Sequence, residues 1–114
     1  MNKDNRKKLV EEYKNREILG GICGIRNTAN QKILIESTTD LAANKNRFDF
    51  FHKTNAMTNN KLKRDWEQYG KEAFQFEVLE ELKKDPLQSQ SNFLKDLELL
   101  KELWIEKFQK DQLY

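Results

Sequence analysis

The chain has 114 residues, of which 21 are Lys or Arg and 19 are Asp or Glu, so its formal net charge is +2. This length fits one domain with its own hydrophobic core, and the single cysteine, Cys23, excludes an intramolecular disulfide and a metal cluster held by cysteines alone. No apolar run approaches the ~18 residues of a membrane-spanning helix, and the N-terminus lacks the apolar stretch of a signal peptide, so we expect a cytoplasmic protein.

The N-terminal segment is strongly charged but has helical periodicity. Leu9, Val10 and Tyr13 form a narrow apolar stripe within residues 3–17, at the spacing of one helix face. We therefore expect a helix there, which makes residues 1–19 a helical extension in front of the domain.

A β-hairpin is predicted over residues 21–37. Two short apolar runs that favour strands, 22–25 and 33–35, flank residues 27–31, which are rich in turn formers. The two adjacent glycines before the first run separate the hairpin from the preceding segment.

The first of two further helices is predicted to begin at Leu41. Asp40 precedes it, with a side chain suited to accept a hydrogen bond from the first turn. The side of this helix that faces the core carries four residues: Leu41, Asn44, Phe48 and Phe51.

A second helix follows a polar loop over residues 54–60. It is predicted over residues 61–69, where Leu62 and Trp66 recur at the spacing of one helix face. Gly70 is typical of the position at which a helix ends.

The C-terminal part adds one strand and one long helix. Phe74, Phe76 and Val78 alternate with polar residues, which predicts a half-buried strand. After a turn that contains the only proline, a helix is predicted over residues 91–109. Its core stripe consists of Phe93, Leu97, Leu100, Trp104 and Phe108. The order of elements indicates an α+β fold in which helices pack on a small sheet.

Charge is distributed unevenly along the chain. Residues 42–64 hold six basic residues against one acid, whereas residues 65–102 hold ten acids against five basic residues. The six basic residues are Lys45, Arg47, Lys53, Lys61, Lys63 and Arg64. A basic flank in a nearly neutral protein is typical of phosphate contacts with DNA or RNA. The alternative is a pair of helices with solvated basic faces.

Several segments, in order, resemble the GIY-YIG endonuclease family. Residues 21–38, GICGIRNTANQKILIEST, resemble its opening hairpin, whose strands read Gly-Ile-Tyr and Tyr-Ile-Gly. Residues 74–82, FQFEVLEEL, resemble its third strand, and residues 99–108, LLKELWIEKF, resemble its last helix. The resemblance spans residues 20–109, which leaves 110–114 as a C-terminal tail. It implies a small three-stranded antiparallel sheet flanked by helices, and hydrolysis of a phosphodiester in DNA.

The catalytic positions of that family are substituted in this chain. The family places two tyrosines, a glycine, an arginine, a histidine and a metal-binding glutamate around the reacting phosphate. In the same order, the matching positions are Cys23, Leu34, Glu36, Asn44, Met57 and Lys101. Lys101 places an ammonium where a divalent metal needs a carboxylate, and Leu34 has no hydroxyl group. We therefore expect no catalytic residue, no bound metal and no cofactor.

Neighbouring residues leave one alternative open. Four side chains lie near the substituted positions in sequence: Arg47, His52, Glu98 and Glu102. If they rebuild the site, the chain is a divergent endonuclease that uses a divalent metal such as Mg²⁺.

Cys23 and the two tryptophans each have a structural and a functional interpretation. Cys23 has no His or Lys near it in sequence, so a small, half-buried strand residue is favoured over a nucleophile. Trp66 and Trp104 fit a hydrophobic core better than a base-stacking platform.

Three functions follow from these observations. The first is a catalytically inactive GIY-YIG relative that binds nucleic acid, DNA or RNA, through its basic helix surface. The second is a protein-interaction or self-associating module without nucleic-acid binding. The third is the divergent endonuclease with displaced catalytic residues.

Overall fold

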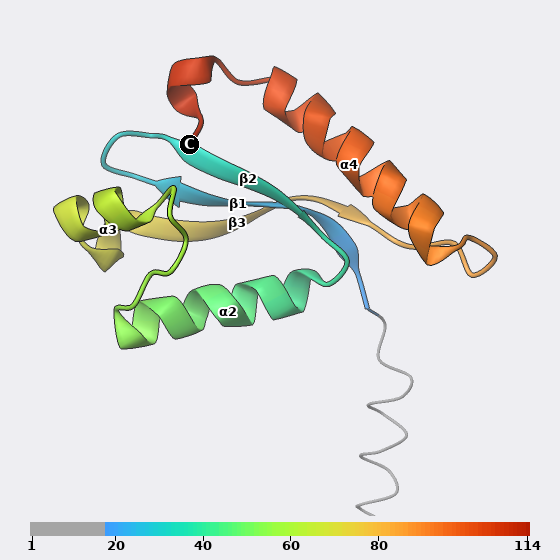
Figure 1. Ribbon diagram of the computed structural model, residues 1–114, viewed down its shortest axis with the longest axis horizontal. Helices are drawn as coiled ribbons and strands as arrows, with labels where there is room; N and C mark the ends of the chain where they lie inside the picture. Colours follow the sequence, from blue (N-terminus) through green and yellow to red (C-terminus); the bar gives the residue numbers. More distant parts are fainter. Residues whose placement is uncertain (1–17) are drawn as a thin grey trace, which may run out of the picture.

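The computed structural model describes residues 18–114 as a three-stranded antiparallel sheet with helices on both faces (Figure 1). Strand β1 (Gly20–Asn27) is central, and β2 (Ile33–Thr38) and β3 (Phe74–Leu82) pair with its two edges. The predicted α+β fold with a small antiparallel sheet is confirmed. The helix predicted over residues 3–17 lies outside the described residues.

The predicted hairpin forms, with a tight connection between β1 and β2. Asn27 donates its backbone N–H to the carbonyl of Lys32 and accepts a hydrogen bond from the N–H of Gln31, both at 2.8 Å. Gln31 adopts the left-handed conformation, with φ of 64°, which reverses the chain within the turn. The turn thereby fixes the register of the two strands.

Three helices pack on the sheet in the described part of the chain (Figure 1). Helix α2 (Leu41–Thr54) begins at the predicted cap, because the Asp40 carboxylate accepts a hydrogen bond from a backbone N–H of the first turn at 3.1 Å. Helix α3 (Lys63–Tyr69) ends at Gly70 as predicted, and α4 (Gln90–Glu106) follows β3 after a turn. Among residues 18–114, no helix is long and apolar enough to span a membrane.

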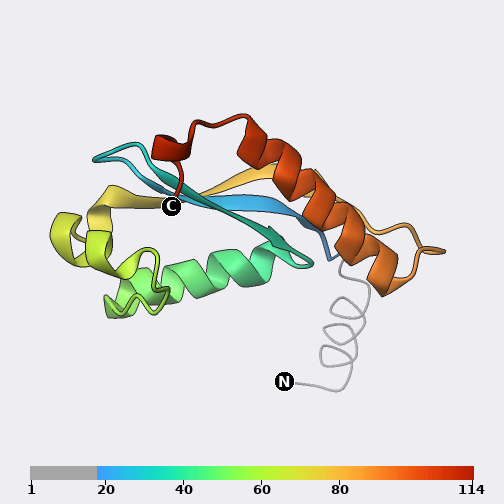
Figure 2. The ribbon, with the colours of Figure 1, turned by 45° about the horizontal axis from the view of Figure 1, so that its top comes forward.

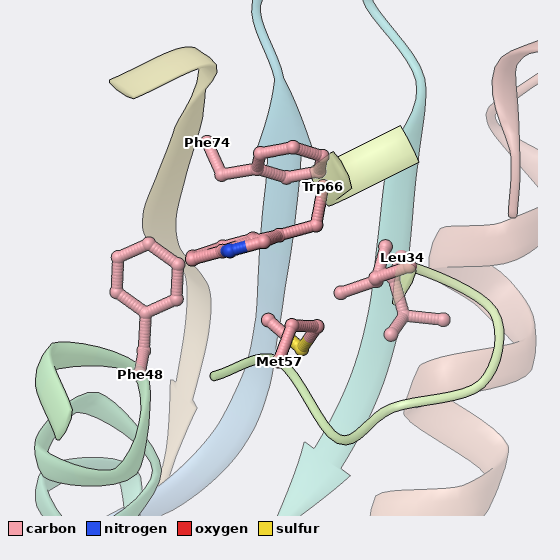
Figure 3. Packing of buried hydrophobic residues seen from close by; sticks show 6 residues of the cluster. Leu34, Phe48, Met57, Trp66 and Phe74 are labelled. Carbon is pink, nitrogen blue, oxygen red and sulfur yellow. The ribbon is translucent and has the colours of Figure 1, made fainter. Parts of the chain in front are cut away.

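Helices α2 and α3 cover one face of the sheet (Figures 1 and 2). The buried cluster on this face consists of Leu34, Phe48, Met57, Leu62, Trp66 and Phe74 (Figure 3). The Trp66 ring is 3% exposed, with its centroid 4.9 Å from that of Phe74. Its indole N–H donates to the side-chain oxygen of Asn55 at 2.9 Å. Trp66 is therefore a core residue, as predicted.

Helix α4 covers the opposite face of the sheet (Figure 2). Ile22, Ile33 and Ile35 are buried there against half-buried side chains that include Leu100 and Trp104. The predicted core stripe of the last helix is therefore confirmed. The sheet separates two hydrophobic cores, one under each helical layer.

The C-terminal residues differ from the prediction. Helix α4 ends at Glu106, earlier than expected, and a short 3-10 helix (Lys110–Gln112) follows. Leu113 then forms an isolated bridge with Ile33, whose carbonyl accepts a hydrogen bond from the backbone N–H of Tyr114 at 3.1 Å. The C-terminus is therefore part of the folded domain rather than a tail, because the early end of α4 lets the chain turn back onto β2.

Tyr114 completes a buried polar network at this end of the sheet. The side-chain amide of Asn27 is fully buried and donates to the Tyr114 hydroxyl at 3.0 Å. That hydroxyl donates to the Asp65 carboxylate at 2.7 Å, which also accepts from Asn30 at 3.2 Å. Burial, and then the bond to Asp65, raise the pKa of Tyr114. The network ties the hairpin, α3 and the C-terminus together.

We expect Tyr114→Phe to destabilise the protein by about 1–3 kcal/mol, because the buried amide of Asn27 loses its acceptor. The measurement is urea-induced unfolding followed by circular dichroism. Tyr69→Phe is the matched control: Tyr69 is 41% exposed, and its hydroxyl has no hydrogen-bond partner within residues 18–114. It should change stability by less than ~0.5 kcal/mol. Equal effects of the two changes would show that the Tyr114 hydroxyl contributes nothing specific.

Candidate functional site

A cavity of about 170 Å³ lies between α2, the sheet face that α2 covers, and the loop after α2. We call it the α2 cavity. Its lining comprises Cys23, Gly24, Ile25, Leu34, Glu36, Asn44, Arg47, Phe48, Phe51, Met57, Thr58, Asn59 and Phe76. Most of this lining is apolar, and the polar groups come from β2, α2 and the loop.

Strand alternation brings the β-strand residues of the α2 cavity together. Cys23 pairs with Glu36 across the hairpin, and Ile25 pairs with Leu34. Because residues two apart on a strand point to the same face, these two pairs form one surface beneath α2. Phe76 extends this surface onto β3, where it pairs with Ile25.

Helical spacing brings the α2 residues to the same cavity. Asn44, Arg47, Phe48 and Phe51 are three or four residues apart, so they share one side of the helix. Phe48 is 7% exposed and belongs to the core, whereas Arg47 is exposed at the mouth of the cavity. Helix α2 thus supplies an apolar wall of the cavity through Phe48 and a positive charge at its mouth through Arg47.

Cys23 lies on the floor of the α2 cavity and is 2% exposed. Its sulfur accepts a hydrogen bond from the side-chain amide of Asn44 at 3.6 Å. The oxygen of that amide in turn accepts from the Thr38 hydroxyl at 2.9 Å. Burial raises the pKa of the Cys23 thiol from 9.0 to about 11, against a smaller opposing effect of the Asn44 hydrogen bond. Cys23 is therefore a buried, protonated thiol, more deeply buried than the half-buried strand residue that we predicted.

Two opposite charges border the α2 cavity. The negative charge of Glu36 raises the pKa of the Cys23 thiol and the positive charge of Arg47 lowers it, so both groups act on the same region. Within residues 18–114, neither side chain makes a hydrogen bond or an ion pair with another residue. Both charged groups are therefore unpaired in this part of the chain.

Two solved structures resemble this chain. The catalytic domain of the homing endonuclease I-TevI matches with a TM-score of 0.61 and 23% sequence identity, over 83% of this chain and 95% of that chain. A mutant of the catalytic domain of the intron endonuclease I-TevI matches with a TM-score of 0.62 and 22% identity, over 85% and 92%. No family profile and no curated protein matches the sequence. The fold is GIY-YIG-like.

Of the six positions that the sequence resemblance matched to catalytic residues of the GIY-YIG family, five line the α2 cavity. They are Cys23, Leu34, Glu36, Asn44 and Met57. The sixth, Lys101, is on α4, which packs on the opposite face of the sheet through Leu100 and Trp104. The structure therefore brings the hairpin, α2 and loop positions together, and Lys101 is not among the residues of the α2 cavity.

The displaced residues that could rebuild a nuclease site do not converge. Arg47 borders the α2 cavity, but the His52 imidazole lies 3.7 Å from the Glu72 carboxylate. Glu98 accepts a hydrogen bond from the Ser37 hydroxyl at 3.1 Å, and Glu102 is exposed on α4. These acids are part of α4, away from the α2 cavity.

The donor set of the α2 cavity does not fit a divalent cation. Glu36 is the only carboxylate among the described residues that line it, whereas Mg²⁺ requires near-octahedral oxygen coordination. No group of three or more His, Cys, Asp or Glu within residues 18–114 could hold a metal ion. We therefore derive no metal-dependent step at this cavity.

The six basic residues lie along α2, the connection to α3 and the first turn of α3, and all are exposed. Lys45 forms an ion pair with Asp49 at 3.3 Å. It lies two residues from Arg47, so the two side chains leave α2 in different directions. Arg47 is the member of the set that borders the α2 cavity.

Sequence reasoning missed the loop and aromatic parts of the cavity. Thr58 and Asn59 line it because the buried Met57 anchors the loop beneath α2. The rings of Phe51 and Phe76 form part of the wall of the cavity. The spacing of the apolar residues placed both phenylalanines on inward faces, but it did not indicate that space remains between them.

We expect the Cys23 thiol to be nearly unreactive in the folded protein. A pKa of about 11 rather than 9.0 leaves roughly a hundredfold less thiolate at pH 8, and burial slows access further. The measurement is the rate of iodoacetamide alkylation at pH 8, with and without denaturant. The native rate should keep rising about tenfold per pH unit until pH approaches 11, whereas the unfolded rate should level off above about pH 9. Equal rates at pH 8 would contradict a buried thiol.

Proposed function

We propose that this chain is a nucleic-acid-binding protein that uses a GIY-YIG-like scaffold without hydrolysing its ligand. One observation carries the proposal: the α2 cavity has a largely apolar floor with a protonated thiol, and an Arg47 guanidinium at its mouth that has no partner within residues 18–114. The two structural neighbours are endonuclease domains, which supports DNA as a ligand class.

The floor of the α2 cavity argues against phosphodiester hydrolysis. Hydrolysis needs an activated water, a group that takes its proton and stabilisation of the developing charge. Leu34 offers no polar group, and the Cys23 thiol is a poor base because its proton stays bound up to about pH 11. The one carboxylate, Glu36, disfavours a second negative charge beside it.

Exposed cations argue for retained binding. Arg47 has no partner within residues 18–114, and Lys53, Lys61, Lys63 and Arg64 continue the positive charge along α2 and the start of α3. Such side chains bind phosphates of any sequence and release counterions, so binding should weaken steeply with salt.

A self-associating module is the second candidate, and the outer surface of α4 favours it. Leu94, Leu99 and Leu103 are 48%, 60% and 49% exposed there. Exposed leucines on one helix are typical of a contact with another protein surface. A single monomeric mass in light scattering across concentrations would contradict self-association.

We expect fluorescently labelled duplex DNA to bind with an affinity that falls linearly with salt on a log–log scale. Arg47→Gln should weaken binding and make the slope less negative by about 0.9, the value for one lost phosphate contact. The measurement is fluorescence anisotropy at several salt concentrations. Lys95→Gln removes the same charge from α4, on the opposite face of the sheet, and should leave the slope unchanged.

The same samples distinguish the remaining hypotheses. A gel after incubation with Mg²⁺ or Mn²⁺ should show intact DNA. Metal-dependent cleavage that Glu98→Ala abolishes would establish the divergent endonuclease instead. No binding of duplex or single strand, DNA or RNA, at low salt would overturn nucleic-acid binding and leave the protein-interaction module.

A further inference from the structure

The α2 cavity combines an aromatic wall with two charges of opposite sign that have no partner in the described part of the chain. Phe48, Phe51 and Phe76 form the wall, and Glu36 and Arg47 stand at the border. A carboxylate repels a phosphate, so its presence beside the cavity does not fit a site for phosphate alone. We propose that the α2 cavity binds a single guanine base extruded from a nucleic-acid strand, an inference that rests on the proposed function.

The size of the cavity suits one ring system. A cavity of roughly 150 Å³ holds a benzene molecule, whereas pockets for whole small-molecule ligands are ~300–1,000 Å³. At about 170 Å³, the α2 cavity accommodates a planar base and leaves the sugar and phosphate outside. Aromatic side chains are the usual stacking partners of unpaired bases.

The carboxylate of Glu36 selects among the bases, because an ionised carboxylate only accepts hydrogen bonds. The Watson–Crick edge of guanine presents two adjacent donors, the ring N1–H and the exocyclic N2 amino group, which match the two carboxylate oxygens. Adenine and cytosine each place a ring nitrogen acceptor beside their amino group, and thymine flanks its one donor with two carbonyl oxygens. A carboxylate meets repulsion from each of those acceptors.

The other polar groups fit this arrangement. The Asn44 amide is already engaged with Cys23 and Thr38, so it holds the floor of the cavity and leaves selection to Glu36. Arg47, exposed at the mouth, is placed to bind the phosphate of the extruded nucleotide. Arg47 therefore contributes to the affinity for any nucleotide, and Glu36 determines which base is preferred.

The test compares labelled duplexes that differ only in one bulged nucleotide: guanine, inosine, adenine, cytosine or thymine. We expect the bulged guanine to bind about tenfold more tightly than adenine in fluorescence anisotropy, from one bidentate pair. Inosine, which lacks the N2 amino group, should fall between them. Glu36→Gln should bring the guanine-to-adenine ratio close to one, whereas Glu102→Gln, with the same charge change on α4, should keep it.

Each outcome decides between this inference and the proposed function. Salt-sensitive binding with no base preference overturns the guanine site and leaves nucleic-acid binding intact. A guanine preference that survives Glu36→Gln also overturns it. A separate calorimetric titration with guanosine monophosphate tests the free nucleotide. If guanosine monophosphate binds through Glu36 while no bulged duplex does, the base is not taken from a strand, and both proposals fail.

Discussion

The central strand β1 is the constraint on which the rest of the structure depends. It pairs with β2 on one edge and β3 on the other, and helices cover both faces of the sheet, so its side chains divide between two layers. Ile22 points to the core beneath α4, and Cys23 points to the core beneath α2. The alternation of β1 thereby decides which residues of its neighbours can meet at one site.

The same alternation explains why Cys23, Leu34 and Glu36 meet at the α2 cavity, whereas Lys101 lies in the other layer. The residues that share the face of Cys23 face α2, and the residues that share the face of Ile22 face α4. Lys101 belongs to the layer that packs on Ile22. At the end of β1, the buried Asn27 needs a hydrogen-bond partner, and Tyr114 supplies it from the C-terminus. The hydrogen bond of the buried Asn27 amide thus holds one end of β1 in place, and apolar packing holds the rest of the strand.

Local patterns predict the elements of this fold well because each carries a local physical signal. Asp40 caps α2, and the alternation in β3 places Phe74 and Phe76 inward. Contacts between distant segments were not predictable in the same way. The role of Tyr114 depends on Asn27 and Asp65, which are far from it in sequence. The size of the α2 cavity likewise depends on how side chains from five segments fill space, and no pattern of spacing reports a volume.

The side chains of the α2 cavity form a chemically consistent set. Leu34 and Met57 join the buried cluster, and Cys23 keeps its proton, so the floor of the site is largely apolar and carries no charge. Charge remains only at the border, on Glu36 and Arg47. An uncharged interior strengthens hydrogen bonds made at its edge, because the local dielectric is low. Under the proposed function, such a site supplies recognition, and one carboxylate and one guanidinium beside an aromatic wall determine what it recognises.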